Sequence, residues 1–131
     1  MVIDTSALAA IFFGEPERDS FLNVISSAES RLVSAATILE TAMVLESRHG
    51  DAGAREFDLF VVRASLGIVP VDTDQVEFAR SAWRKFGKGR HAAGLNFGDC
   101  FSYALAKSTG EPLLAKGTDF QATGITLQPI S

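Results

Sequence analysis

Four acidic residues that are far apart in the chain, Asp4, Glu40, Asp99 and Asp119, could together bind a divalent cation. Each follows a short apolar segment or lies in the first turn of an expected helix. In a parallel α/β sheet such positions share the carboxyl edge, where these folds place their ligands. Converging carboxylates repel one another, and they stay ionised together only around a cation such as Mg²⁺ or Mn²⁺, which prefer oxygen ligands. The spacing therefore predicts a metal site.

Each acid also has a purely structural explanation. Asp4 could accept backbone N–H bonds at the start of a helix. The residues Thr37–Glu40 match a capping box, and Asn96 with Asp99 could cap the helix that follows them. Asp119 could simply close a turn. Four unrelated caps would not be expected at the same edge of a sheet, so the common position of the four acids favours a shared groove. Spacing alone does not establish that the acids converge.

A basic block interrupts an otherwise acidic chain. The formal net charge is −4, which by itself argues against a polyanionic partner. No acidic residue occurs between Phe78 and Gly98, however, and His91 lies in the same stretch. The cations of this block are Arg80, Arg84, Lys85, Lys88 and Arg90. The block is either a surface for a polyanion or an ordinary solvated helix face followed by a glycine-bearing loop.

Short apolar runs alternate with longer stretches of helical spacing, which predicts βαβ units around a mainly parallel sheet of four to five strands. Helices cover both faces of such a sheet, so the expected fold is a three-layer α/β/α sandwich. Short helices are expected from Ser6 and from Pro16, and longer ones over 36–48 and around 57–64. The expected strands are Val2–Ile3, Leu32–Ser34, Ile68–Val71, Pro112–Ala115 and, more weakly, Ile125–Gln128.

Composition indicates one compact domain over residues 1–131. The chain is 47% hydrophobic and 21% charged, which is enough apolar material for one core. The first residues lack a basic leader and a membrane-length apolar run, which predicts a cytoplasmic protein without a membrane partner. The single cysteine, Cys100, excludes an internal disulfide and is expected to be a spectator. Trp83 shares helical spacing with Val76 and Ala79, which predicts a place in the core or at a subunit interface.

The motifs around the four acids resemble those of the PIN-domain ribonucleases, in particular the VapC-type toxins of bacterial toxin–antitoxin pairs. The opening sequence Met-Val-Ile-Asp4-Thr-Ser is similar to the first family motif, and Thr37–Glu40 to the second. The segment Asn96-Phe-Gly-Asp99 resembles the third motif, and Lys116-Gly-Thr-Asp119 resembles the fourth. The resemblance covers essentially the whole chain.

The resemblance implies a PIN-like nuclease that hydrolyses RNA with a metal-activated water. Asp4, Glu40, Asp99 and Asp119 would form the catalytic pocket and hold one or two Mg²⁺ ions, or Mn²⁺ in their place, with Asp4 and Asp99 as the best candidates for direct ligands. It further implies a VapB-like antitoxin and a second copy of the chain as partners. Residues expected to contact RNA are Arg84, Lys88 and Arg90, with Ser6 and Lys116 near the pocket.

Two other classes of protein would also cluster acids at a sheet edge. A non-catalytic receiver-like binding module is disfavoured because the first strand ends in Asp-Thr-Ser rather than in an acidic pair. A metal-dependent phosphatase of the haloacid-dehalogenase kind would have Asp-x-Asp near the start, but position 6 is Ser. Metal-dependent cleavage of RNA, tested beside acetyl-phosphate labelling and phosphatase assays, separates the three.

Overall fold

The computed structural model describes residues 1–130 and contains one parallel sheet of four short strands. Its order is β3-β2-β1-β4, and every pairing is parallel. Val2 in the central strand pairs with Leu32 on one side and with Leu113 on the other. The strands are β1 (Val2–Ile3), β2 (Leu32–Ser34), β3 (Gly67–Val69) and β4 (Leu113–Leu114). This sheet confirms the predicted parallel α/β class.

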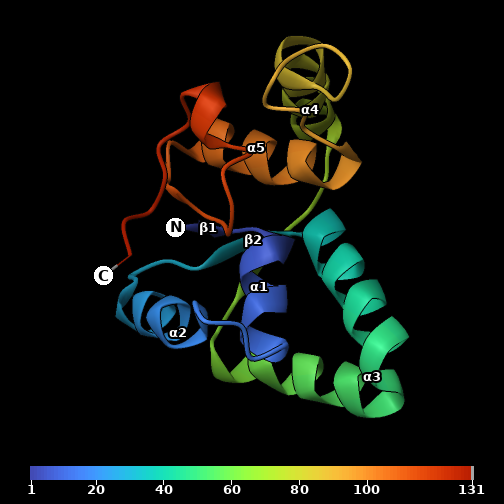
Figure 1. Ribbon diagram of the computed structural model, residues 1–131, viewed down its shortest axis with the longest axis vertical. Helices are drawn as coiled ribbons and strands as arrows, with labels where there is room; N and C mark the ends of the chain where they lie inside the picture. Colours follow the sequence, from blue (N-terminus) through green and yellow to red (C-terminus); the bar gives the residue numbers. More distant parts are fainter. Residues whose placement is uncertain (131) are drawn as a thin grey trace.

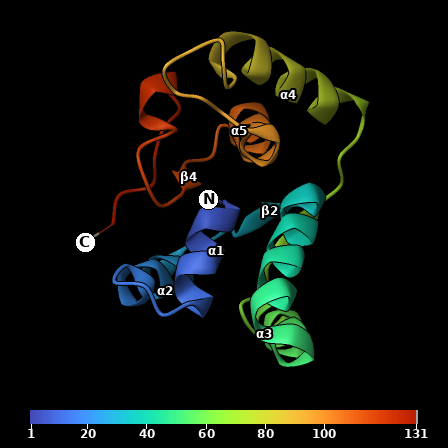
Figure 2. The ribbon, with the colours of Figure 1, turned by 45° about the vertical axis from the view of Figure 1, so that its right-hand side comes forward.

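Helices cover both faces of the sheet, as Figure 1 shows. One layer consists of the first three helices, and the fourth and fifth lie together on the opposite face, an arrangement that the turned view in Figure 2 repeats. The helices are α1 (Thr5–Phe12), α2 (Arg18–Ser27), α3 (Ala35–Arg63), α4 (Thr73–Phe86) and α5 (Phe97–Thr109). A short 3-10 helix, η1 (Gln121–Thr123), follows β4. The three-layer prediction is therefore confirmed.

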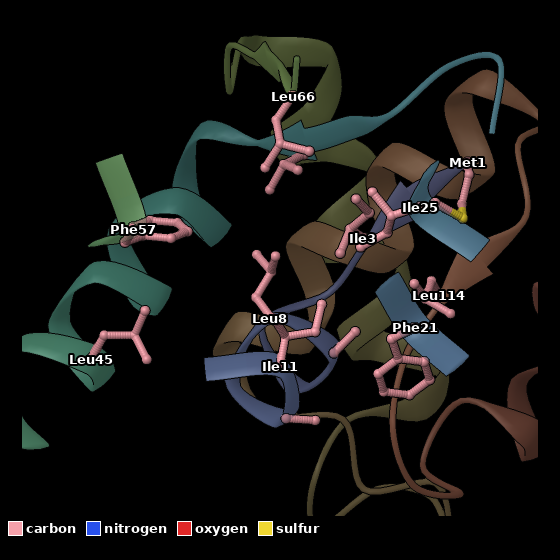
Figure 3. Close-up of a cluster of buried hydrophobic side chains, with 13 residues drawn as sticks. Met1, Ile3, Leu8, Ile11, Phe21, Ile25, Leu45, Phe57, Leu66 and Leu114 are labelled. Carbon is pink, nitrogen blue, oxygen red and sulfur yellow. The ribbon is translucent and has the colours of Figure 1, made fainter. Parts of the chain in front are cut away.

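Each face of the sheet has its own apolar core because side chains alternate along a strand. Ile3 points into the cluster beneath α1, α2 and α3, where Leu8, Phe21 and Phe57 are fully or almost fully buried (Figure 3). Val2, its neighbour, belongs to the second cluster, which α4 and α5 cover. The two cores hold β1 at the centre of the molecule and so fix the position of Asp4 directly after it.

The long helix α3 combines two helices that the sequence predicts separately. Gly50 interrupts it with a non-helical backbone (φ 61°, ψ −149°). Only glycine adopts this conformation readily, so Gly50 forms a kink between the two expected helices. The helix begins after Ser34, whose side chain accepts a hydrogen bond from the Ala36 N–H at 3.2 Å. The capping box expected at Thr37 is therefore wrong, because the N-cap lies three residues earlier.

Three strand expectations need correction, and the first of them is the fourth strand, which occupies 113–114 rather than 112–115. The third strand occupies 67–69 rather than 68–71. The segment 125–128 forms no strand, and only Leu127 makes an isolated parallel bridge to Leu113. In the part of the chain that the structure describes, no helix is long and apolar enough to cross a membrane. Residue 131, the end of the predicted domain, lies outside the described range.

Candidate active site

Asp4 is the buried centre of the site. It directly follows β1, its side chain is almost inaccessible with a 3% exposed fraction, and both carboxylate oxygens accept hydrogen bonds. The Ser6 backbone N–H donates to one oxygen at 3.0 Å and the Ser102 hydroxyl to the other at 2.6 Å. The expected helix-capping role of Asp4 is thus real. Capping accounts for one oxygen only, and the second is held by a hydroxyl from α5.

Ser102 belongs to a buried polar pair behind Asp4. Its hydroxyl lies 3.4 Å from that of Thr37, and both side chains have exposed fractions of at most 1%. Since the Ser102 proton points to Asp4, the Thr37 hydroxyl donates to Ser102. Buried polar groups that are fully paired rigidify their surroundings. This relay therefore fixes the orientation of the Asp4 carboxylate.

Glu40 is held by a second hydroxyl relay. The Thr5 hydroxyl donates to Oε1 of Glu40 at 2.5 Å, and the Thr41 hydroxyl, which is fully buried, donates to that of Thr5 at 3.1 Å. The side chain of Glu40 therefore reaches toward α1 rather than back to the start of its own helix. Because Thr5 directly follows Asp4, this contact places the Glu40 carboxylate near Asp4.

Gly98 allows α5 to approach Glu40. A Cβ atom built at this position would collide with the Glu40 carboxylate. The backbone of Gly98 is not in the left-handed region, so the requirement for glycine is one of space rather than of conformation. Since Asp99 is the next residue, this close approach brings the carboxylates of α3 and α5 to the same place.

Asp99 lies in the first turn of α5 and is partly buried. Its carboxylate accepts a hydrogen bond from the Asn96 N–H at 3.1 Å, while Asn96 accepts one from the Asp99 N–H at 2.9 Å, so the expected capping box exists. The pKa of Asp99 is nevertheless raised to about 6, first by burial and then by the negative charges of Asp4, Asp119 and Glu40, against the lowering effect of the Asn96 bond. The other three acids therefore all lie within electrostatic reach of Asp99.

Asp119 is the peripheral member of the group. Its side chain is exposed and lies in the loop between β4 and η1. Ser6 helps to anchor that loop, because its hydroxyl accepts a hydrogen bond from the Lys116 N–H at 2.9 Å. The Lys116 ammonium, which was expected near an RNA phosphate, contacts the carboxylates of Glu15 and Glu17 instead.

The donor set fits a divalent ion that keeps part of its water shell. Within residues 1–130 no three His, Cys, Asp or Glu side chains are grouped closely enough to hold a metal ion by themselves. Mg²⁺ commonly binds through one or two protein carboxylates and retains several waters. The carboxylates of Asp4, Glu40, Asp99 and Asp119 supply oxygen donors and uncompensated negative charge, which suit such an ion better than a softer metal.

The basic block lies at the end of α4 and in the loop that leads to α5. Arg84, Lys88 and Arg90 are exposed, whereas the Arg80 side chain forms an ion pair with Glu77 at 3.0 Å. Hydrogen bonds from the Lys88 N–H to Leu95 and from the Leu95 N–H to Phe86 close this loop at its base. The cations therefore precede Asn96, the cap of the helix that carries Asp99.

A groove of about 650 Å³ runs between α4 and α5 beside this loop. Its walls include Trp83, Phe97 and Phe101, and its rim includes Arg80 and Lys88. Trp83 has an exposed fraction of 45%, which excludes the core alternative and leaves the subunit interface as a prediction. The Arg90 guanidinium lies 3.9 Å from the centre of the Trp83 ring system, in cation–π contact.

Sequence reasoning missed Ser102, Thr5 and Gly98. Ser102 is 98 positions from the carboxylate that it contacts, and on its helix it looks like any small core residue. The helical spacing of Asp99 and Ser102, three positions apart, was an available signal, since it places both on one face of α5.

A PIN domain is the class that this fold and this arrangement of acids define, and the model of the PIN domain family matches residues 1–125. Ribonuclease VapC30 of Mycobacterium tuberculosis is 54% identical over 125 residues, covering 95% of each chain. Ribonuclease VapC of Mycolicibacterium smegmatis is also 54% identical, over 95% of this chain and 97% of its own. The chain belongs to the PIN-domain family. Within that family its relatives are VapC ribonucleases, which confirms the predicted family and the predicted class of enzyme.

Solved structures agree on the fold. The sarcin-ricin loop cleaving toxin VapC20 of Mycobacterium tuberculosis superposes with a TM-score of 0.77 at 23% identity and covers 98% of both chains. VapBC2 from Rickettsia felis, bound to a DNA fragment from its promoter, superposes with a TM-score of 0.76 at 14% identity, over 99% of this chain and 98% of its own. At these identities the likeness concerns the fold alone.

Proposed function

We propose that this chain is a Mg²⁺-dependent endoribonuclease that acts as the toxin of a toxin–antitoxin pair, with Mn²⁺ as a possible substitute, and that residues 1–131 form one nuclease domain. The observation that carries the proposal is geometric: hydroxyl groups hold the Asp4 and Glu40 carboxylates, and α5 approaches Glu40 at Gly98, directly before Asp99. Four carboxylates from separate elements repel one another until a cation joins them.

Asp4 and Asp99 are the proposed principal metal ligands, with Glu40 and Asp119 beside them. A bound ion would neutralise charge on the scissile phosphate and activate a water molecule for attack. Asp4 is fixed for this role by Ser6 and Ser102. The Glu40 carboxylate is oriented by Thr5 and receives the proton of the attacking water.

RNA binding is proposed for Arg84, Lys88 and Arg90. Their exposure and their place before Asn96 support a backbone-binding surface on the approach to Asp99. Such cations also offset the field of the acidic pocket, which would otherwise repel a polyanion. Ser6 supports the pocket indirectly, through its contacts with Asp4 and with the loop that carries Asp119.

The proposed partners are a VapB-like antitoxin and a second copy of the chain. An apolar surface beside the acids supports a protein partner: Leu39, Met43 and Phe97 have exposed fractions of 63%, 59% and 82%. Leu39 and Met43 lie four apart on α3, and Phe97 begins α5. Light scattering of the purified chain tests the dimer, and a monomeric mass at micromolar concentration would contradict it. A cytoplasmic location remains a prediction.

RNA cleavage by the purified protein tests the proposed activity. Wild-type protein should cut a structured RNA when Mg²⁺ is present and stop when the ion is chelated. Asp4→Asn and Asp99→Asn should each lower the cleavage rate at least about 100-fold, because each removes a ligand charge from the metal site. The matched control is Asp58→Asn, an exposed acid on α3. Full activity in either site variant, or cleavage that survives chelation, would contradict the proposal.

A further inference from the structure

Lys116 joins the last strand to a distant turn. It begins the loop between β4 and η1 in which Asp119 lies. Its ammonium contacts the Glu15 carboxylate, 101 positions away, and lies 3.1 Å from Oε2 of Glu17. Glu15 and Glu17 flank Pro16 in the turn between α1 and α2.

These contacts hold Lys116 where it is. The ammonium lies 3.1 Å from Oε2 of Glu17, an atom that is itself buried, and compensates its charge. The side chains of Lys116 and Glu17 are 36% and 27% exposed, so solvent screens the pair, and its role is to hold the loop rather than to add much stability. The two carboxylates also raise the pKa of Lys116, so the ammonium stays charged. Lys116 is therefore committed to its own fold rather than free to bind RNA.

The loop is fixed at three points: the Lys116 side chain, the Lys116 backbone N–H and the Phe120 side chain. The Lys116 N–H donates to the Ser6 hydroxyl at 2.9 Å, and the Ser6 N–H donates to Asp4 at 3.0 Å. At the far end, Phe120 is buried in the core beneath α4 and α5. Asp119 itself is exposed and lies in this loop, three residues after Lys116. The position of its carboxylate thus depends on how the loop is held.

We propose that Glu15, Glu17 and Lys116 form a latch that positions Asp119 at the metal site. The three are positioning residues, and none of them touches the reacting groups. The inference rests on the proposed metal-dependent nuclease, because it assigns to Asp119 a share in binding the ion.

Neutralising all three side chains tests the latch without leaving a charge unpaired. The variant Glu15→Gln/Glu17→Gln/Lys116→Met keeps their approximate size. It should raise the Mg²⁺ concentration for half-maximal RNA cleavage, and the dissociation constant for Mn²⁺ measured by calorimetry, by about 10-fold, as is common when partners of metal ligands are removed. Lys116→Arg keeps the charge and should remain near wild type. Lys107→Met, which removes an exposed cation from α5, is the matched control and should have no effect.

A double-mutant cycle separates positioning from general stability. If the latch acts through Asp119, the triple change should add nothing in an Asp119→Asn background. An unchanged Mn²⁺ dissociation constant in the triple variant, or the same 10-fold loss in the Asp119→Asn background, would overturn the latch. If wild-type protein binds Mn²⁺ but cuts no RNA, the proposed function fails, and the binding measurement still decides the latch.

Discussion

Asp4 and Asp99 lie at one site but are held in opposite ways. The carboxylate of Asp4 is buried, and each of its oxygens accepts a hydrogen bond, one from a backbone N–H and one from a hydroxyl. Asp99 has one such bond, from Asn96, and its pKa is raised to about 6 by burial and by its acidic neighbours. The difference indicates a division of labour, in which Asp4 is a fixed ligand and Asp99 is the group whose charge a cation must balance.

The variant Ser102→Ala tests whether the Asp4 carboxylate is a fixed ligand, and it should have the largest effect. The change leaves one oxygen of a buried carboxylate without its donor, which costs about 1–3 kcal/mol of unfolding free energy. Because the orientation of Asp4 depends on that bond, the cleavage rate should also fall about 10- to 100-fold. Rates with saturating Mg²⁺ and urea unfolding measure the two effects.

The control for Ser102→Ala is Ser26→Ala, which removes an exposed hydroxyl on α2. It should change neither quantity. If the Ser102→Ala protein cleaves RNA at the wild-type rate, the fixed role of Asp4 is wrong.

The variant Gly98→Ala tests the close approach of α5 to Glu40 on α3. The added methyl group would overlap the Glu40 carboxylate, which must move and give up its hydrogen bond from Thr5, at a cost of about 1 kcal/mol. In a Glu40→Ala background the collision disappears, and alanine should then be neutral or stabilise α5 by up to about 1 kcal/mol over glycine. Thermal unfolding of the four proteins should show this change of sign. The same cost in both backgrounds would mean that Gly98 is needed for another reason.

The pH dependence of the stability of Asp99→Asn tests whether the Asp99 carboxylate is strained by its surroundings, and it should show the smallest effect. The folded-state pKa of Asp99 is raised from its ordinary 3.8 to about 6, so ionised Asp99 destabilises the fold above about pH 6. This cost is relieved as the pH falls from about 6 toward 4, where the folded state holds a proton that the unfolded state lacks. Without metal, the variant should be more stable than wild type by about 1 kcal/mol at pH 7.5, after allowance for solvent screening.

The stability difference of Asp99→Asn should vanish near pH 4. Urea unfolding at the two pH values, with chelator present, measures it, and Asp58→Asn again serves as the control. A constant difference across this range would show that the carboxylate of Asp99 is not under strain from its neighbours.

The positions of Asp4 and Asp99 on the fold follow from local signals in the sequence. Asp4 ends a strand, and Asn96 with Asp99 begins a helix, so a parallel sheet brings them to one edge. Local signals misplace the start of α3, however. Thr37 and Glu40 match a capping box, but the end of β2 makes Ser34 the cap and leaves Glu40 free to meet Thr5.

The supporting contacts could not be predicted from local signals, since their partners lie far along the chain. Ser102 meets Asp4 across 98 positions, and Lys116 meets Glu15 across 101. Gly98 matters only because α3 and α5 approach there, which depends on the packing of both helices. Trp83 is exposed for a related reason: helical spacing identifies a shared face but not whether another element of the same chain covers it, so the sequence left core and subunit interface open.

Calorimetric titration of Mn²⁺ into the metal-free protein at pH 7.5 tests the central claim most directly, because it measures cation binding by the four acids without relying on RNA. We predict saturable binding to the wild type, at least about 10-fold weaker binding to Asp99→Asn, and unchanged binding to Asp58→Asn. Equal binding to the wild type and to Asp99→Asn would contradict the assignment of this acidic cluster as a metal site.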